Sequence, residues 1–334
     1  MDCSRPHQDD RMKDHRSRGI QYTEKTAGLQ GFSDGNFSGT AADGWKKRNG
    51  YVILSGKGYQ LRTGACVLRF RFDHDLHIHS RLSACSCDPG QTGERILQYA
   101  RDCGLHTVCL TDHMWDSAVP GASDWYRPQN YEHICLAKPL PRDKDIRFLF
   151  GCETEMDRRY VLGISRPVLD ALDFIAVPTT HLLMTGFTIS QEDAATHTGL
   201  AAAWVSRLDS LLDRDLPFEK MGVAHLTTSA IGPGMEQVPE TLRAIPESEM
   251  ERLFSKAASA GIGIELNAAA LEFDEKDADI FLKPYRIAKS CGCHFYCGSD
   301  AHRPGRFGEV KEIFERAISR LNLQERDKID LLLS

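Results

Sequence analysis

The chain has 334 residues, 41% of them hydrophobic, and a formal net charge of −6. This acidic balance gives no electrostatic case for binding nucleic acid or an anionic membrane surface. No apolar run reaches the ~18 residues of a membrane span, and the N-terminus lacks the apolar stretch of a signal peptide. We therefore expect a cytoplasmic protein with no membrane or nucleic-acid partner. Nothing in the sequence indicates an oligomeric state.

The first 66 residues are predicted to be a polar extension, either flexible or holding a small β-structure. Residues 1–50 are rich in Gly, Ser, Asp, Lys and Arg and show little apolar periodicity. Residues 51–62 (YVILSGKGYQLR) carry two short β-type runs around a Gly-Lys-Gly turn, which is a moderate hairpin signal. The main domain is expected to span residues 67–334.

From residue 67 onward, short apolar runs alternate with amphipathic segments. We expect strands at Val67–Phe72, Thr107–Leu110, Ile146–Phe150, Phe174–Val177, Met221–Ala224, Ile262–Leu266 and His294–Cys297. Helices are expected at residues 92–103, briefly from 165, and at 194–212, 246–261, 276–291 and 307–321. This alternation predicts parallel βαβ units, which form either a closed barrel or an open doubly wound sheet.

Acid or imidazole side chains lie at the C-terminal end of all seven predicted strands. The segments that carry them are Asp75–Ser80, Thr111–His113, Gly151–Glu155, Pro178–His181, His225, Glu265–Asn267 and Gly298–His302. In a closed parallel barrel these ends converge on one face, whereas an open sheet spreads them along an edge. The pattern therefore favours a distorted (β/α)₇ TIM-like barrel with its active site at that face.

The histidine spacing indicates metal binding. His77 and His79 are two residues apart, so an extended strand places both imidazoles on the same side. Asp300 and His302 repeat this spacing on the last strand, which lies beside the first strand in a closed barrel. Imidazole and carboxylate together are suitable ligands for Zn, Mn or Fe.

Six motifs, in this order along the chain, resemble the PHP (polymerase and histidinol phosphatase) superfamily. They are DLHIHS at 75–80, LTDH at 110–113, GCE at 151–153, DFIAVPTTH at 173–181, Ala224-His225 and SDAH at 299–302. The resemblance spans about residues 73–307. It implies a distorted (β/α)₇ barrel, two or three divalent metal ions, and phosphoester hydrolysis as the commonest activity.

The resemblance also implies a ligand set. The first metal would be held by His77, His79, Glu153 and Asp300. The second would share Glu153 and add His181 and His225. The third would take His113, His302 and one ligand from the loop after the first strand. For that ligand we choose Asp88, with a thiolate of Cys85 or Cys87 as the alternative.

Supporting roles are expected for several neighbours. Asp75 and Asp112 are expected to accept N–H bonds that fix imidazole tautomers. Glu155 and Glu265 are interpreted as supporting carboxylates, and Asn267 as a residue that reaches the substrate.

The predicted activity is metal-dependent hydrolysis of a small phosphorylated metabolite or nucleotide. Cations bridged by Glu153 would generate a hydroxide nucleophile from water, with Asp112 in support. Arg303 and Arg306 are positioned to bind phosphate, although a solvated loop explains them equally well. Histidinol phosphate is one candidate substrate by analogy, and nucleotide phosphates or oligonucleotide ends are others.

Two other functions remain open. An amidohydrolase-type reaction would require eight strands and often a metal-bridging lysine, and the alternative to both enzymes is a non-catalytic metal-stabilised module. The long loop from Met114 to Asp145 carries Trp115, Trp125 and Tyr126. These aromatic residues form either a lid or stacking wall for substrate, or a packed surface loop.

Overall fold

The computed structural model describes residues 68–232 and 237–332. The predictions made for residues 1–66, including the hairpin at 51–62, lie outside the described residues. No helix among the described residues is long and apolar enough to cross a membrane.

The described residues build a parallel sheet with the strand order β1-β2-β4-β5-β6-β7-β8. The bounds are β1 His74–Ile78, β2 Thr107–Leu110, β4 Arg147–Thr154, β5 Phe174–Pro178, β6 Met221–Ala224, β7 Gly263–Asn267 and β8 Phe295–Gly298. A two-residue strand, β3 (His113–Met114), pairs with β4 alone. Every pairing between these strands is parallel, as the βαβ alternation predicted.

The two ends of this sheet meet where β1 and β8 end. Asp300 N–H donates to His77 O at 2.7 Å, and His79 N–H donates to Ala301 O at 3.2 Å. Ile78 and Ala301 form a parallel bridge. The sheet is therefore a nearly closed barrel, which confirms the predicted fold class and brings the first and last strands together.

The position of the first strand was predicted wrongly. The described part of the predicted apolar run, 68–72, does not form it; β1 is His74–Ile78, which contains the start of the DLHIHS motif and pairs with β2. The segment before it packs elsewhere, since Phe70 N–H donates to Leu323 O at 3.2 Å. A strand whose inward side chains line a polar site lacks a continuous apolar run, so hydropathy placed it too early.

The register of β1 shifts between Asp75 and Ile78. Such an irregularity breaks the strict alternation of a strand and re-aims side chains. Leu76 packs in the small inner cluster of the barrel, whereas Ile78 packs in the main core outside it. His77 and His79 both point to the site despite the inward Leu76.

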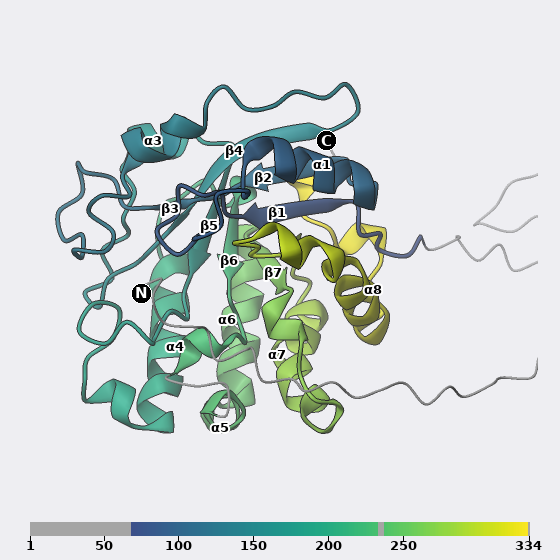
Figure 1. Cartoon of the computed structure of the whole chain (residues 1–334). Coiled ribbons are helices and arrows are strands. Elements are labelled where there is room, and N and C mark those ends of the chain that lie inside the picture. Colours follow the sequence, from purple (N-terminus) through teal and green to yellow (C-terminus); the bar gives the residue numbers. More distant parts are fainter. Residues whose placement is uncertain (1–67, 233–236, 333–334) are drawn as a thin grey trace, which may run out of the picture. The chain divides into compact units, whose positions relative to one another are not determined.

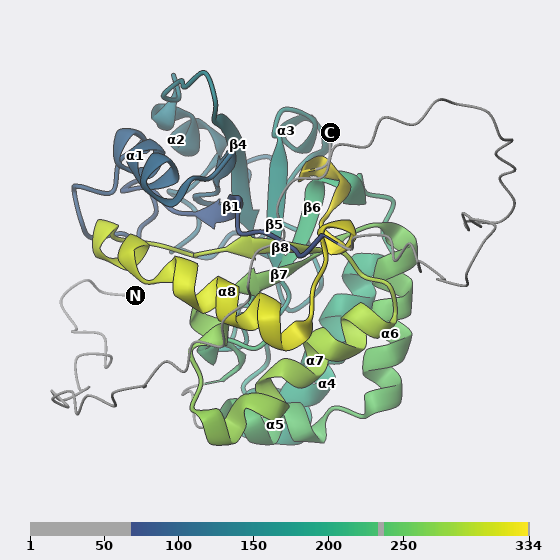
Figure 2. The same cartoon turned by 90° about the vertical axis from the view of Figure 1, so that its right-hand side faces the viewer.

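Helices pack outside the strands. The predicted helices appear as α1 (Gly93–Cys103), α3 (Arg166–Asp170), α4 (His197–Leu212), α6 (Glu247–Ala260), α7 (Ala278–Ser290) and α8 (Val310–Leu321). Figure 1 shows α4, α6 and α7 along one side of the strands, and Figure 2 shows α8 running past α7 and β8. Two helices were not predicted: α2 (Tyr131–Ile134) and α5 (Val238–Ala244), which are only four and seven residues long.

Local sequence explains where α1 begins and ends. Thr92 caps α1, because its hydroxyl oxygen accepts from Arg95 N–H at 3.3 Å, and Gly104 ends it in the left-handed conformation at φ 70°.

A small apolar cluster fills the barrel below the site. It contains Leu76, Cys109, Leu149, Phe174, Ala176, Ala224, Tyr296 and Ile329. The ring of Tyr296 fits because β6 and β7 present glycines to it; a Cβ on Gly222 would lie 2.3 Å from that ring. The interior is thus filled by side chains, and the polar site lies above this cluster, at the C-terminal ends of the strands.

Candidate metal centre

Glu153, on β4, lies at the middle of the site. Its Oε2 is 3.3 Å from His77 Nε2, 3.2 Å from His79 Nε2 and 2.9 Å from His113 Nδ1. Its Oε1 is 3.7 Å from His181 Nε2 and 3.4 Å from His225 Nε2. Five imidazoles from four segments of the chain therefore surround one fully buried carboxylate.

Asp300 is the second carboxylate of the cluster. Its Oδ1 lies 3.1 Å from His79 Nε2, and its Oδ2 lies 3.1 Å from His225 Nε2. His225 and Asp300 both adopt positive φ, 61° and 53°. For residues other than glycine this conformation costs ~1–3 kcal/mol and persists where the surroundings impose it, commonly at functional sites.

Glu265, on β7, orients His77. Its Oε1 accepts from His77 Nδ1 at 2.6 Å, and its Oε2 accepts from His225 N–H at 2.8 Å. This leaves His77 Nε2 facing Glu153. Gly298 makes room for the contact, because a Cβ there would lie 2.1 Å from Glu265 Oε1. The supporting role predicted for Glu265 matches this geometry.

Glu155 orients His181 in the same way, and a residue that the sequence analysis missed holds Glu155. Its Oε2 accepts from His181 Nδ1 at 2.8 Å, and its Oε1 accepts from Arg207 Nη2 at 2.8 Å. Arg207 is 1% exposed and also donates to Thr179 O at 2.8 Å and Thr188 O at 2.9 Å. Its position on the predicted helix of residues 194–212 gave no sign of this contact.

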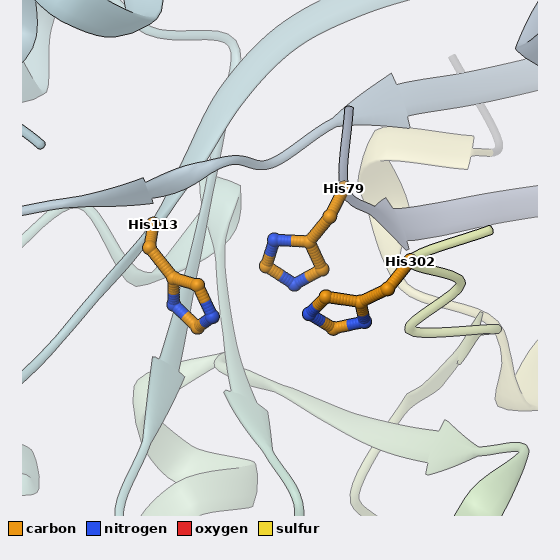
Figure 3. Close-up of side chains that lie close together, drawn as sticks. All are labelled: His79, His113 and His302. Carbon is orange, nitrogen blue, oxygen red and sulfur yellow. The ribbon is translucent and has the colours of Figure 1, made fainter. Parts of the chain in front are cut away.

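A second cluster of ligand atoms, the three-histidine group, consists of His79, His113 and His302. Figure 3 shows the imidazole of His79 between the other two, which approach it from separate segments. The rings of His79 and His302 stack with centroids 4.1 Å apart, and those of His79 and His113 lie 4.4 Å apart. Two further sets of ligand atoms are close enough for one ion: His77 with His79 and Asp300, and the Glu153 group of His77, Glu153 and His225.

Neutral partners hold the three-histidine group. Ser83 Oγ accepts from His79 Nδ1 at 2.9 Å and from His113 N–H at 3.2 Å, and it donates to Asp112 Oδ1 at 2.7 Å. Asp112 thus reaches an imidazole only through Ser83, not by the direct N–H bond expected. His302 Nδ1 donates to the backbone oxygen of Asp300 at 2.8 Å. Ser83 was missed because a serine beside a strand has no distinctive spacing.

Asp75 does not fix an imidazole tautomer, although the sequence analysis predicted that role. Its Oδ1 accepts from Ser299 N–H at 2.9 Å, and its Oδ2 accepts from Tyr99 O–H at 2.9 Å. Asp75 therefore ties β1 to the end of β8 rather than fixing an imidazole. Burial raises its pKa to about 6.

The pKa values of the histidine ligands shift in two directions. Burial acts to lower the pKa of His77 and His225, but the charges of neighbouring carboxylates outweigh it, and the pKa of His225 rises to about 9. The pKa values of Glu153 and Asp300 are held well below their usual range by the imidazoles, against the effect of burial. Burial and the charge of His79 lower the pKa of His302 to about 3, and burial lowers the pKa of His113.

Several ligand atoms of this site have no hydrogen-bond partner among the described residues, and they show whether the site suits a metal ion. Both oxygens of Glu153, Nε2 of His225, Nδ1 of His113 and Oδ1 of Asp300 are buried without a hydrogen-bond partner in the described part of the chain. Leaving buried polar groups unpaired is costly, and most of all for charged carboxylates. Divalent cations would satisfy these oxygen and nitrogen atoms together, so the residues present fit a multi-ion centre.

Asp88 does not join the cluster. It is exposed, and its Oδ1 accepts from Gly90 N–H at 2.8 Å. Cys87 is exposed as well, whereas Cys85 is partly buried. The pKa of the Cys85 thiol is raised by burial and then by the charges of Asp300 and Glu153. Cys85 is therefore the loop candidate whose thiol interacts with the metal-site carboxylates in the described part of the chain.

The two predicted phosphate-binding arginines differ. Arg306 is engaged, because its Nη1 donates to Glu272 Oε1 at 2.7 Å and to Glu309 Oε2 at 3.3 Å. Arg303 follows His302 directly, is exposed, and forms no ion pair within residues 68–232 and 237–332. Arg303 is therefore the arginine available to a ligand. Asn267 donates to Glu265 and accepts from Ala269 N–H, so it is occupied in the protein.

The aromatic residues of the loop after β3 pack beside the metal ligands. The ring of Trp125 stands edge-on to His113 with centroids 5.0 Å apart, and that of Tyr126 lies 6.0 Å away. Trp115 is buried and its Nε1 donates to Val119 O at 2.8 Å. Trp115 thus belongs to the packed base of the loop, and the other two border the site.

In sequence, no family model and no curated protein matches this chain. In structure, it is similar to a histidinol phosphate phosphatase from Lactococcus lactis subsp. lactis Il1403, solved with zinc, L-histidinol and phosphate. That match has a TM-score of 0.54 and 18% identity, and covers 77% of this chain and 98% of that one. A candidate histidinol phosphatase from Listeria monocytogenes matches with a TM-score of 0.47 and 14% identity, over 72% of this chain and 99% of that chain. The barrel expected from the resemblance to the PHP superfamily is therefore the fold that this chain shares with the Lactococcus structure.

Proposed function

We propose that this chain is a metal-dependent phosphoesterase of the PHP superfamily that hydrolyses a small phosphorylated metabolite or nucleotide. One observation carries the proposal: both oxygens of the buried Glu153 are unpaired and face imidazoles within 3.7 Å. A carboxylate in this position is suited to bridge two cations. Paired cations are a recurrent device for displacement at phosphorus.

We assign the ligands as follows. One ion takes His77, His79, Glu153 and Asp300; a second shares Glu153 and adds His181 and His225; a third takes His113 and His302. For the ligand from the loop after β1, Cys85 replaces our first choice of Asp88, because Asp88 is exposed and bonded within its own turn. A sulfur ligand would favour zinc over manganese at that ion.

When bound, the cations supply Lewis acidity and lower the pKa of water toward neutrality. The chain itself fixes the geometry: Glu265 and Glu155 keep the Nε2 atoms of His77 and His181 aimed at the site. Arg303 is free to bind a phosphoryl group bidentately at the rim. Asp112 acts as a positioning residue through Ser83.

Phosphorus chemistry is favoured over the amidohydrolase alternative by two features. The Lactococcus structure of the same fold was solved with phosphate and zinc. In the described part of the chain, the buried lysine is Lys328, and it pairs with Asp73 at the opposite end of β1, at 2.8 Å. No described lysine is therefore in place to bridge metals.

The test uses the full chain, stripped with a chelator and reloaded separately with Zn²⁺, Mn²⁺ or Fe²⁺. Each form is assayed against phosphomonoesters, including histidinol phosphate and nucleoside monophosphates, and against a matched set of amides. We expect phosphate release that is lost on chelation and restored by metal. Amide cleavage without phosphate release would support the amidohydrolase, and bound metal without turnover of either set would support the non-catalytic module.

A further inference from the structure

Tyr126 is fixed in the loop after β3. Its backbone oxygen accepts from Gln129 N–H at 2.8 Å. Its ring packs against Trp125, Phe187 and Trp115, with centroids at 4.7, 5.8 and 6.2 Å. The side chain is fully buried, so its orientation is set by packing rather than by solvent.

The hydroxyl of Tyr126 has no partner in the described part of the chain. Buried hydroxyl groups normally find one, because an unpaired donor or acceptor is destabilising. Two other buried tyrosines follow this rule: Tyr99 O–H donates to Asp75 at 2.9 Å, and Tyr285 O–H bonds with Thr227 at 3.2 Å. The hydroxyl of Tyr296 is also unpaired among the described residues, but its ring lies in the apolar cluster inside the barrel. Tyr126, unlike Tyr296, packs against a candidate metal ligand, His113.

The ring of Tyr126 lies beside a candidate metal ligand. Its ring is edge-on to His113, with an interplanar angle of 86°. Beside it, the indole Nε1 of Trp125 is a second buried donor without a partner.

The two carboxylates nearest to Tyr126 already have other neighbours. Glu155 accepts from His181, Arg207 and Met156 N–H, and Glu153 faces the imidazoles. A buried donor that lies beside a cation site and has no protein partner suits an oxygen atom brought by a ligand. A phosphoryl group, bound by the cations through some of its oxygens, offers such an acceptor.

We propose that Tyr126 is a catalytic residue that donates its O–H to a phosphoryl oxygen of the substrate, with Trp125 Nε1 as a second donor. The proposal rests on the proposed phosphoesterase function. It assigns the aromatic loop to recognition of the phosphoryl group itself. No covalent step is involved, and the phenol keeps its proton throughout.

The test compares Tyr126→Phe with the wild-type full chain at equal measured metal content. Loss of one donor should lower kcat/KM at least about tenfold and raise the inhibition constant of inorganic phosphate by a similar factor. The melting temperature should stay equal or rise, because the variant removes an unpaired buried hydroxyl. Trp125→Phe should give a smaller loss. The control is Tyr160→Phe, since Tyr160 is exposed and its hydroxyl bonds with Ser206, and it should change nothing.

Unchanged kinetics and phosphate inhibition in Tyr126→Phe would overturn the proposal. If the wild type hydrolyses no phosphoester, the proposed function fails separately, and binding of inorganic phosphate to the metal-loaded proteins decides this point. Weaker phosphate binding by Tyr126→Phe than by wild type would then support the donor role. Equal binding would refute it.

Discussion

The two sides of the metal centre are built differently. In the Glu153 group, His77 is backed by the carboxylate of Glu265, and the pKa of the neighbouring His225 rises to about 9. In the three-histidine group, the Nδ1 atoms of His79 and His302 pair with the hydroxyl of Ser83 and a backbone oxygen, and the pKa of His302 falls to about 3. A charged partner strengthens an imidazole ligand more than a neutral one does. We therefore expect the Glu153 group to bind metal more tightly and the three-histidine group to lose it first.

Glu153→Gln should have the largest effect, because it removes the charge shared by both sides. We expect kcat/KM to fall by about 10³-fold or more, and the number of bound ions to drop, with the secondary structure retained. Metal analysis and steady-state kinetics measure this. Glu192→Gln, at an exposed position, is the matched control. Full metal content together with near-normal turnover would show that Glu153 is not the bridge.

Arg207→Met should destabilise the fold, because it leaves the Glu155 charge buried without its partner. Removing one member of a buried ion pair typically costs ~3–5 kcal/mol. Urea denaturation of the metal-free protein measures the loss, with the exposed Arg316→Met as control. In the same set, Glu155→Gln should weaken zinc binding by about 10–100-fold through His181. A stable Arg207→Met protein with unchanged zinc affinity would mean that this pair does not support the site.

Ser83→Ala should weaken the ions that His79 and His113 hold and leave the ion held by His181 and His225 unchanged. Loss of the hydroxyl frees the ring of His79 and breaks the link to Asp112, so we expect the weakest ion to bind about tenfold less tightly. Stepwise removal with a chelator, followed by metal counting, separates this ion from the others. Ser259→Ala, on the exposed surface of α6, should leave all ions unchanged. Equal weakening of every ion would contradict the division into two sides.

The smallest expected difference between the two sides is in how zinc affinity changes with pH. The pKa of His225 is raised to about 9 in the metal-free chain, so below pH 9 zinc must displace a proton there. Affinity at that ion should rise as the pH increases from 6 to 9, by at most about tenfold per unit for each proton displaced. His302, with a pKa of about 3, is already neutral over this range and contributes no such slope. Competition titrations at several pH values measure both, and equal slopes would refute the distinction.

The fold class and the gathering of the motif residues could be predicted because both follow from periodicity. Apolar runs alternating with helices specify parallel strands, and the C-terminal ends of such strands lie on one face. Glu153, His225 and Asp300 were identified in this way, from their place after or at the end of a run. The first strand was misplaced for a related reason: in β1 the polar ligands are part of the strand, so hydropathy selected the run before it.

What the sequence by itself determined was which residues could bind metal and the order in which they meet the face of the barrel. Only the tertiary structure decided which atoms meet. In the folded chain Asp88 bonds within its own loop, and Asp112 reaches His79 only through Ser83. Arg207 forms an ion pair with Glu155, and the Tyr126 hydroxyl has no partner in the described part of the chain. These choices depend on contacts between segments up to tens of residues apart, and no periodic pattern encodes the direction of a single side chain.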